Sequence, residues 1–391
     1  MNYILFDEAT MRTNLLPLTY TRPVAELVIG ITSIREKWNA LLGTETSTLT
    51  EKYLSKKYPL VEKDTNVLID ASVLPTPKLV TAIKKLKPNQ AISSTDSIIA
   101  YCMSNKEIGK SNEHDDMQET EYNGDIIKID NLWDLYLYNE EVIRSDFARL
   151  TADRKSQKIS KTNVVIGNVE DIFIEEGAVV EGATLNTKNG VIYIGKDAQI
   201  MEGACVRGPF AMAEHAVVKM GAKIYGGTTL GPYVKVGGEV ENVIFTGYSN
   251  KPHDGFLGNS VVGEWCNIGA GTNSSNLKNT YDEVRLWNYT WNTFEPTGQQ
   301  FCGLFMGDHT KVAIQTTFNT GTVIGVGANV FGAGFQRNFI ASFTWGGKQS
   351  DLEKVLDIAA RMYARRGRTL DKVDKDILKN VFKQSQRYRI A

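Results

Sequence analysis

The side chain best suited to acid–base chemistry in this sequence is one of only four histidines. His253 lies in the stretch SNKPHDGFLGNS, just before a run of regular repeats resumes. Imidazole titrates close to neutral pH, so a positioned histidine can take a proton from an amine or a hydroxyl group. A loop histidine can equally be hydrogen-bonded to a neighbour without a catalytic role. Which reading applies depends on what the surrounding sequence builds around His253.

The surrounding sequence, residues 164–335, repeats every six residues in the pattern aliphatic-x-x-x-small-x. The aliphatic or aromatic positions are Ile174, Val180, Ile194, Ile200, Val218, Ile224, Leu230, Val236, Phe256, Val262, Ile268, Val312, Phe318, Ile324 and Val330. The fifth positions are Ala178, Thr184, Ala198, Ala204, Ala222, Thr228, Val234, Val240, Ser260, Cys266, Thr272, Thr316, Thr322, Ala328 and Gly334. Because none of these fifth positions is charged or large, both columns are expected to face inward.

A period of six matches neither an α-helix nor an amphipathic strand. It predicts a left-handed parallel β-helix, in which each hexapeptide forms one face of a triangular coil and neighbouring coils stack. Glycines are expected at corners that need positive φ. The alternative, an irregular all-β domain with glycine-rich turns, would not hold a six-residue phase. Three breaks in the phase, at residues 206–217, 242–255 and 276–303, predict loops that leave the coil, where sites are often built.

The first 150 residues are predicted to form an α/β domain. Its strand candidates are Tyr3–Phe6, Val67–Ile69, Ile98–Cys102 and Ile126–Ile129. Its helix signals are a capping box at Ser33 and Glu36 with Gly43 as the stop, Thr76 before Pro77, and Asn131 as a cap. Residues 104–124 are polar and acidic and predict a surface loop, and residues 151–161 predict a linker between domains.

The last 40 residues are predicted to be helical, with a capping box at Ser350 and Glu353. Residues 351–391 hold 11 Lys and Arg against 6 Asp and Glu, a net charge of +5. The favoured interpretation is a cap that closes the end of the solenoid with a solvated basic face. The alternative is that Arg365, Arg366 and Arg368 attract a phosphorylated cofactor.

Composition excludes several other classes of protein. The net charge of −1 gives no overall field that would attract nucleic acid. The four cysteines include no Cys-x-x-Cys pair, so we expect neither a zinc site nor a disulfide framework. The N-terminal apolar run, Tyr3 to Phe6, is too short for a signal peptide, and no stretch is long enough to span a bilayer. We therefore expect a cytoplasmic protein that contacts neither nucleic acid nor membrane.

The segment HDGFLGNSVVGEWCNIGAGTNSSN, residues 253–276, resembles the acetyltransferase core of the bifunctional N-acetylglucosamine-1-phosphate uridylyltransferase / glucosamine-1-phosphate acetyltransferase family. In that family a histidine opens a similar stretch, an asparagine opens NIGAGT, and a second asparagine follows. Carried across without gaps, the resemblance implies His253 as the catalytic base and Asn267 and Asn276 as active-site asparagines. It also implies that the backbone N–H of Ala270 holds the acetyl carbonyl, with acetyl-CoA as the donor.

The sequence departs from that family at positions that contact the acceptor. Phe256 stands where the family has a tyrosine, and acidic residues stand where it places lysines on the sugar phosphate. Lys251 and Lys278 are close enough in the sequence to substitute for those lysines. The resemblance therefore implies acyl transfer to a sugar phosphate or a nucleotide sugar, with the identity of the sugar left open.

The segment LLPLTYTRPVAELVIGITSI resembles the signature of sugar nucleotidyltransferases, which join a nucleoside triphosphate to a sugar 1-phosphate. The resemblance implies that Asp70, at the end of VLIDASVLP, and Asp130, in KIDNLWDL, hold Mg²⁺. The glycine-rich phosphate loop of that family is replaced by FDEATMRTN, so Arg12 and Arg22 are the candidates for binding the nucleotide. The alternatives are that Asp70 is a turn residue and Asp130 a helix cap.

These interpretations combine into one expected architecture. A shortened nucleotidyltransferase-like domain of the Rossmann-like α/β class covers residues 1–150, and a linker covers 151–163. A left-handed β-helix of the acyltransferase type covers 164–345, and C-terminal helices cover 346–391. The expected function is that of a transferase in sugar-nucleotide biosynthesis, with a non-catalytic, nucleotide-sugar-binding or structural protein as the alternative.

Two further expectations concern assembly and an excluded reaction. Solenoids of this kind pack side by side, so we expect a homotrimer with the cofactor between neighbours. A zinc hydratase of the γ-carbonic-anhydrase kind shares the β-helix but needs closely spaced histidines. The gaps from His215 to His253 and from His253 to His309 do not provide them.

Overall fold

The computed structural model describes residues 1–94, 97–104, 108 and 117–389, and the chain forms two compact units. The N-terminal unit contains residues 1–15, 21–27 and 32–131, and the solenoid unit contains residues 16–20, 28–31 and 132–391. None of the helices in the described residues is long and apolar enough to cross a bilayer.

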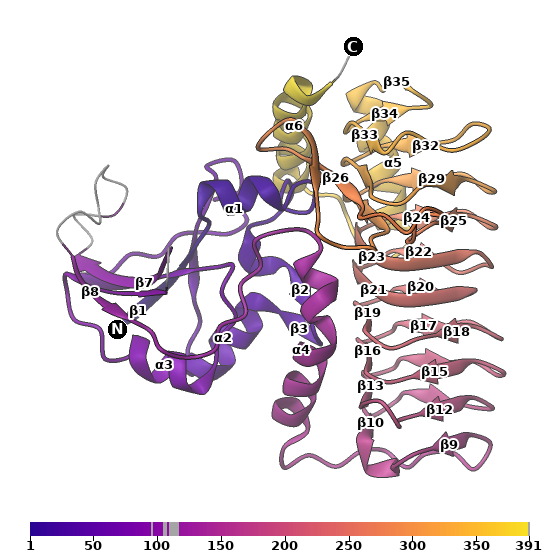
Figure 1. The fold of residues 1–391 in the computed structure, drawn as a ribbon, viewed down its shortest axis with the longest axis horizontal. Helices are drawn as coiled ribbons and strands as arrows, with labels where there is room; N and C mark the ends of the chain where they lie inside the picture. The colour runs from indigo at the N-terminus through magenta and orange to yellow at the C-terminus, as the bar shows by residue number, and fades with distance from the viewer. Residues whose placement is uncertain (95–96, 105–107, 109–116, 390–391) are drawn as a thin grey trace. The chain divides into compact units, whose positions relative to one another are not determined.

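The N-terminal unit is an α/β domain built on a six-stranded sheet in the order β4-β1-β5-β7-β6-β8 (Figure 1). β1 runs parallel to β4 and β5, and β7 runs antiparallel to β5 and β6. The elements are β1 (Asn2–Phe6), α1 (Ala9–Asn14), η1 (Val24–Glu26), β3 (Thr32–Ser33), α2 (Ile34–Leu42), β4 (Ser47–Leu49), β5 (Thr65–Asp70), α3 (Pro77–Ile83), β6 (Gln90–Ser94), β7 (Ser97–Ser104) and β8 (Gln118–Glu121).

Local signals in the sequence place most of these elements correctly. The predicted strands near residues 3, 67 and 98 are β1, β5 and β7. Ser33 and Glu36 form the predicted capping box of α2, and Gly43 ends that helix with φ of 76°. Thr76 caps α3 through a bond from the Leu79 N–H.

Three local predictions in and beside this unit differ from the structure. Residues 126–129 form no strand: only Lys128 pairs, in a single antiparallel bridge with Val73. Asn131 caps no helix, because α4 begins at Asp134 after Trp133. The expected loop at 104–124 contains β8, which pairs parallel with β6, and residues 105–107 and 109–116 lie outside the described part.

The solenoid unit is a parallel β-helix whose coils stack one upon another (Figure 1). Each coil has three short strands, which we call the first, second and third faces. The first face comprises β10 (Ile172–Ile174), β13 (Ile192–Ile194), β16 (Phe210–Met212), β19 (Thr228–Leu230), β28 (Leu304–Met306), β31 (Thr322–Ile324) and β33 (Phe339–Ile340). The second comprises β11 (Val179–Val180), β14 (Gln199–Ile200), β17 (Val217–Val218), β20 (Lys235–Val236), β22 (Asn250–Lys251), β24 (Asn267–Ile268), β29 (Lys311–Val312), β32 (Asn329–Val330) and β34 (Thr344–Trp345).

The third face comprises β9 (Val164–Ile166), β12 (Thr184–Asn186), β15 (Cys205–Arg207), β18 (Lys223–Ile224), β25 (Asn273–Ser274) and β30 (Thr317–Phe318). Two longer strands, β21 (Glu239–Gly247) and β23 (Phe256–Glu264), bend around a corner and join the third face to the first. The other elements are β2 (Val28–Ile29), α4 (Asp134–Thr151), η2 (Val169–Asp171), β26 (Arg285–Asn288), β27 (Thr293–Pro296), β35 (Lys348–Gln349), α5 (Leu352–Ala364), α6 (Lys372–Ser385) and η3 (Gln386–Tyr388).

The predicted inward columns form one continuous apolar core along the prism. Every aliphatic position of the repeat except Phe256 belongs to this core. At Phe256 the phase is off by one residue: Leu257 points inward, and Phe256 is only half-buried. The predicted β-helix is thus confirmed, with a local shift at the segment that follows His253.

Of the three segments predicted to form loops that leave the coil, only one does so. Residues 206–217 continue the coil through β16, and residues 242–255 continue it through β21 and β22. Only residues 276–303 leave the coil, and they carry the antiparallel pair β26–β27.

Helix α4 belongs to the solenoid unit, although the expected N-terminal domain extended to residue 150, near the end of this helix. Its buried Ile143 packs with Phe173, Tyr193 and Ala211 of the first face. Asn139 donates to the Gly227 carbonyl oxygen at 2.7 Å. The compact division therefore falls at residues 131 and 132, because the apolar side of α4 covers the first coils.

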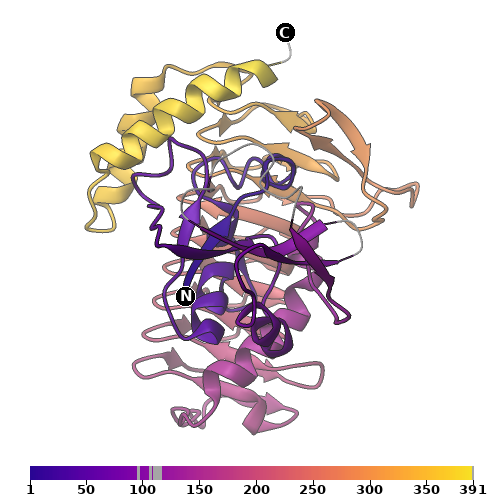
Figure 2. The same cartoon turned by 90° about the vertical axis from the view of Figure 1, so that its left-hand side faces the viewer.

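The C-terminal helices lie along the upper coils rather than across the end of the stack (Figures 1 and 2). Tyr363 of α5 stacks on Trp265, and Phe382 of α6 packs edge-on to Phe343, so the tail follows the corner between the first and second faces. The N-cap of α5 is Asp351, which accepts from the Lys354 N–H, and not the predicted Ser350.

Candidate functional site

His253 lies at the corner between the second and third faces, in the turn from β22 to β23, and it is exposed. Its backbone is held by Lys251, whose ammonium donates to the carbonyl oxygens of His253 at 2.8 Å and of Gly237 at 3.0 Å. The turn is therefore fixed from inside the prism while the imidazole faces outward from the corner.

Lys251 breaks the repeat in a way that the sequence pattern did not reveal. It pairs with Val236 in the preceding coil, so a lysine occupies a position of the inward column. The side chain is 2% exposed, and burial lowers its pKa to about 8, although nearby Asp254 acts in the opposite direction. A buried ammonium is tolerated only when its hydrogens are bonded. Lys251 thus lies where it can position the His253 turn, not where it could reach a ligand on the surface.

Ala270 and Asn267 belong to the coil that follows His253. The Gly271 N–H donates to the Asp254 carbonyl oxygen at 2.9 Å, so the corner containing Ala270 stacks directly on the corner containing His253. Within the described residues, the Ala270 N–H has no acceptor. Asn267 faces outward on the second face, paired with Asn250 on one side and Lys311 on the other.

Phe256 and Asn276 come together on the third face. A Cβ built on Gly258 would lie 2.7 Å from Phe256 Cζ and 2.6 Å from Asn276 Nδ2, so only glycine lets the ring and the amide approach over this position. Asn276 Nδ2 also donates to Asn259 Oδ1 at 2.8 Å. The predicted site residues therefore fall into two groups, with His253, Asn267 and Ala270 by one corner and Phe256 and Asn276 across the third face.

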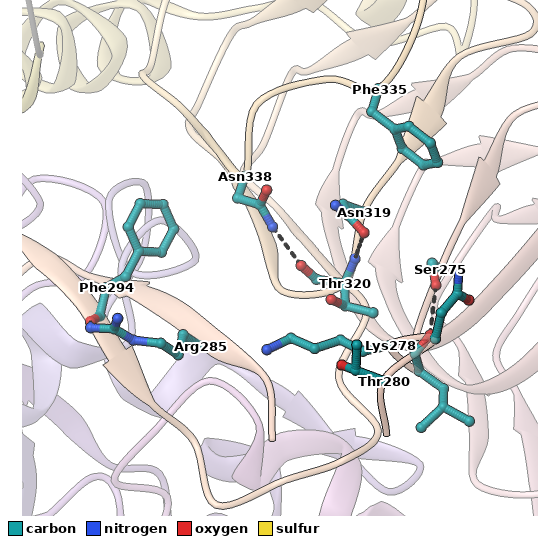
Figure 3. Close-up of a pocket in the computed structure, with 11 residues that line it drawn as sticks. Ser275, Lys278, Thr280, Arg285, Phe294, Asn319, Thr320, Phe335 and Asn338 are labelled. Carbon is teal, nitrogen blue, oxygen red and sulfur yellow. Dashed lines mark hydrogen bonds between the residues drawn. The ribbon is translucent and has the colours of Figure 1, made fainter. Parts of the chain in front are cut away.

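A cavity of about 590 Å³ opens beside Asn276, where the chain leaves the coil (Figure 3). Lys278 points toward the side of the cavity where Arg285 lies, and the Arg285 guanidinium is turned toward Phe294 (Figure 3). Lys278 Nζ donates to the Glu283 carbonyl oxygen at 2.6 Å, and Arg285 donates to the Phe294 carbonyl oxygen. The full lining is Ser275, Leu277, Lys278, Asn279, Thr280, Arg285, Phe294, Asn319, Thr320, Phe335 and Asn338.

This lining suits an anionic, hydroxyl-rich ligand. Two cations provide charge, and three asparagines provide both donors and acceptors. Asn338 Nδ2 donates to the Thr320 carbonyl oxygen at 2.6 Å, and Asn319 Oδ1 accepts from the Thr320 N–H at 3.1 Å, so these amides are pre-oriented. Of the lining residues, sequence reasoning identified only Lys278. Asn319 and Asn338 come from different coils and Arg285 comes from the β26–β27 hairpin, so the coil register and the hairpin together bring them to one cavity.

The N-terminal unit brings Asp70 and Asp130 to one cation, which is Lys128. The Lys128 ammonium lies 3.5 Å from Asp70 Oδ2 and 3.6 Å from Asp130 Oδ1. Burial raises the pKa of Asp70, and Lys128 and the hydrogen bonds from Ser72 oppose that shift. In the described part of the chain, no three His, Cys, Asp or Glu side chains converge as a metal site would require.

Arg12 and Arg22 also lie together, and both are buried. Arg12 donates to Asp7 Oδ2 at 3.1 Å, to the Arg22 carbonyl oxygen at 3.2 Å and to the Tyr53 hydroxyl at 2.9 Å. Burial raises the pKa of Asp7, and Arg12 and a bond from Thr50 act against it. Arg12, which was predicted to bind a nucleotide, is thus paired with Asp7. This carboxylate lies in the segment that stands in place of the family's glycine-rich loop.

Comparison with known families finds a match over the N-terminal part of the chain. Residues 3–155 match a family described as sugar nucleotidyl transferase. Over these residues the chain is similar to sugar nucleotidyl transferases, in keeping with the α/β fold of the N-terminal unit. The match extends beyond the compact division at residues 131 and 132 and includes α4.

Curated relatives extend the similarity to two-domain proteins. The chain is 31% identical over 169 residues to a bifunctional sugar-1-phosphate nucleotidylyltransferase/acetyltransferase of Sulfurisphaera tokodaii, covering 42% of this chain and 38% of that protein. It is 26% identical over 238 residues to the bifunctional protein GlmU of Carboxydothermus hydrogenoformans, covering 52% and 48%. The chain thus spans less than half the length of either relative. The resemblance to this bifunctional class is confirmed at low identity.

Among the solved structures that match the chain is a UDP-N-acetylglucosamine acyltransferase from Campylobacter jejuni. It matches with a TM-score of 0.26 and 13% identity, covering 59% of this chain and 95% of that one. The fold assignment of the solenoid unit rests on its own strand pairing, and this match adds nothing to it.

We expect the stability contributed by Lys251 to depend on pH. With a pKa of about 8 in the folded protein against 10.5 in the unfolded chain, the folded state binds fewer protons between these values. Relative to Lys251→Met, the free energy of unfolding of the wild type should therefore rise by about 3 kcal/mol from pH 8 to pH 10.5. Urea denaturation of both proteins across this range measures the difference. If the difference in the free energy of unfolding between the two proteins did not change with pH, the lowered pKa of the buried Lys251 would be wrong.

Proposed function

We propose that the solenoid unit transfers an acetyl group from acetyl-CoA to an amine or hydroxyl group of a sugar phosphate or nucleotide sugar. The observation that carries the proposal is the exposed His253, fixed by the buried Lys251 at a corner stacked against Ala270. The similarity to bifunctional nucleotidylyltransferase/acetyltransferases supports the same reaction class.

The reaction needs one group that accepts a proton and one hydrogen-bond donor that stabilises the developing oxyanion. His253 takes the proton of the attacking amine or hydroxyl as that atom bonds to the thioester carbonyl carbon. The carbon–sulfur bond breaks, and the thiolate leaves and takes up a proton. The Ala270 N–H supplies a fixed donor for the carbonyl oxygen as charge develops on it. Asn267 and Asn276 orient the donor and the acceptor.

The cavity beside Asn276 is the proposed acceptor site. Lys278 and Arg285 lie there, where a phosphate would need cations, and the amides of Asn319 and Asn338 suit sugar hydroxyl groups. Lys251 has its ammonium on backbone carbonyls, so in this proposal Lys278 alone of the two lysines contacts the acceptor. Phe256 offers an aromatic surface between this cavity and His253.

The second face is the proposed path of the acyl donor. Arg366 Nη2 donates to Asn250 Oδ1 at 3.2 Å, and Asn250 pairs with Asn267 in the next coil. Burial lowers the pKa of Lys235, and the neighbouring cations Arg366, Lys219 and Arg365 lower it further, so positive charge is concentrated here. Phosphates of the donor would relieve that repulsion, which favours a role of the C-terminal arginines in binding the cofactor.

For the N-terminal unit, the family match supports a role with a nucleotide or a nucleotide sugar. Nucleotidyl transfer onto a sugar 1-phosphate with Mg²⁺ at Asp70 and Asp130 is one form of that role. Binding without catalysis is the other, and the ion pairs of Lys128 and Arg12 favour it. The proposal also places the protein in the cytoplasm, where its four free cysteines would stay reduced.

Loss of the imidazole should abolish most acyl transfer. We expect His253→Ala to lower kcat by about 10²–10⁴-fold, the usual contribution of a general base. The assay follows free thiol from acetyl-CoA over a panel of sugar 1-phosphates and nucleotide sugars. His215→Ala is the matched control, because His215 is part-exposed at a different corner and should leave the rate unchanged. Full activity of His253→Ala on the best acceptor would disprove the role.

Lys278 should act on acceptor binding and not on the chemical step. For a phosphorylated acceptor, we expect Lys278→Met to raise KM by about 10-fold, the loss of one charge-assisted contact, with kcat largely retained. Lys56→Met, an exposed lysine of the N-terminal unit, controls for the change in net charge. An unchanged KM for every phosphorylated acceptor would remove the cavity from the site.

The proposal includes a homotrimer that forms the donor cleft between neighbouring solenoids. Light scattering of the wild-type chain should therefore give about three times its mass of 43.4 kDa. A monomer at micromolar concentration would contradict this assembly.

A further inference from the structure

The carboxylates predicted to hold Mg²⁺ in the N-terminal unit are already bridged by a protein cation. Lys128 Nζ lies 3.5 Å from Asp70 Oδ2 and 3.6 Å from Asp130 Oδ1, and it donates to the Ser97 hydroxyl at 3.1 Å. A metal ion that bridged these two carboxylates would have to lie between the same oxygens. The ammonium and a divalent cation therefore compete for one position.

The backbone fixes Lys128 in this position. Lys128 forms an antiparallel bridge with Val73, in the turn that follows β5. On either side, the Ile129 N–H donates to the Ser72 carbonyl oxygen and the Leu74 N–H donates to the Ile127 carbonyl oxygen, both at 2.9 Å. The chain is thus tied on both sides of Lys128, and the lysine side chain has a short, defined path to Asp70.

Asp70 needs a cation because it is buried. Its side chain is 3% exposed, and Oδ1 accepts from the Ser72 N–H at 2.9 Å and from the Ser72 hydroxyl at 2.8 Å. The other oxygen, Oδ2, faces Lys128. Leaving a buried carboxylate uncompensated is strongly destabilising, so Lys128 supplies charge that the folded unit requires even without a ligand.

In the segment that replaces the glycine-rich phosphate loop, a protein carboxylate similarly occupies the position expected for a ligand anion. Asp7, at the end of β1, has one oxygen on Arg12 and the other on the Val24 N–H at 2.9 Å. The side chain of Asp7 is 1% exposed, so this pair is not a surface ion pair. A carboxylate of the protein therefore pairs with the arginine that was predicted to bind the nucleotide.

We propose that Lys128 is the resident cation of the N-terminal unit, in the place where Mg²⁺ would bind between Asp70 and Asp130. The unit then needs no divalent metal, and it does not catalyse metal-dependent nucleotidyl transfer. Removal of the ammonium converts the same two carboxylates into a site for a divalent cation. This inference is independent of acyl transfer by the solenoid unit.

Binding of Mn²⁺, measured by electron paramagnetic resonance on the full chain, tests this inference directly. The wild type should bind no Mn²⁺ that depends on Asp70, with or without UTP, so wild type and Asp70→Asn should give the same titration. Lys128→Met keeps the length of the side chain without its charge and should gain about one Mn²⁺ per chain. Adding Asp70→Asn to Lys128→Met should abolish that gain.

Thermal unfolding gives a second readout and a control for folding. Lys128→Met should unfold at a lower temperature than the wild type, and Mn²⁺ or Mg²⁺ should restore part of the loss. Lys128→Arg keeps a cation and should remain insensitive to both metals. Mn²⁺ binding by the wild type that is lost in Asp70→Asn would overturn the inference. A folded Lys128→Met protein that gains no Mn²⁺ would overturn it as well.

Discussion

The structure of the solenoid unit depends on the stacking of coils around one apolar prism. Each coil contributes only a few inward side chains, and its backbone is paired only because other coils lie above and below it. The constraint fixes the direction of every side chain on the faces, so outward residues from repeats far apart in sequence form columns. A site on such a scaffold is therefore assembled across coils, as the approach of both Phe256 and Asn276 to Gly258 shows.

The same constraint explains why departures from the repeat gather near His253. Lys251 takes an inward position that Val236 holds in the coil before, and its ammonium bonds to backbone at the His253 corner. Phe256 takes an outward position where the phase shifts by one. Each departure makes the core less regular and changes which side chains lie at the His253 corner. Such local departures from an otherwise regular repeat are typical of a functional site.

The sequence predicted the repeat well because apolar periodicity is a local signal with one physical cause, burial. The family resemblance named His253, Asn267 and Ala270 as site residues, and in the structure the turn that contains Ala270 stacks on the turn that contains His253. The sequence could not predict the cavity at Lys278, because Arg285 and Asn338 approach it only through coil register and the β26–β27 hairpin. Lys128 was missed for a related reason: residues 126–129 have the composition of a strand, yet a single bridge to Val73 directs the lysine between two carboxylates.

The most direct test of the account is whether the His253 corner is a binding site for the acyl donor. Nuclear magnetic resonance of the full chain with ¹⁵N-labelled histidine, assigned by comparison with His253→Ala, reports on each imidazole separately. Addition of coenzyme A should shift the imidazole resonances of His253 and leave those of His215 in place. A His253 signal that stays unchanged at saturating coenzyme A would contradict the central claim.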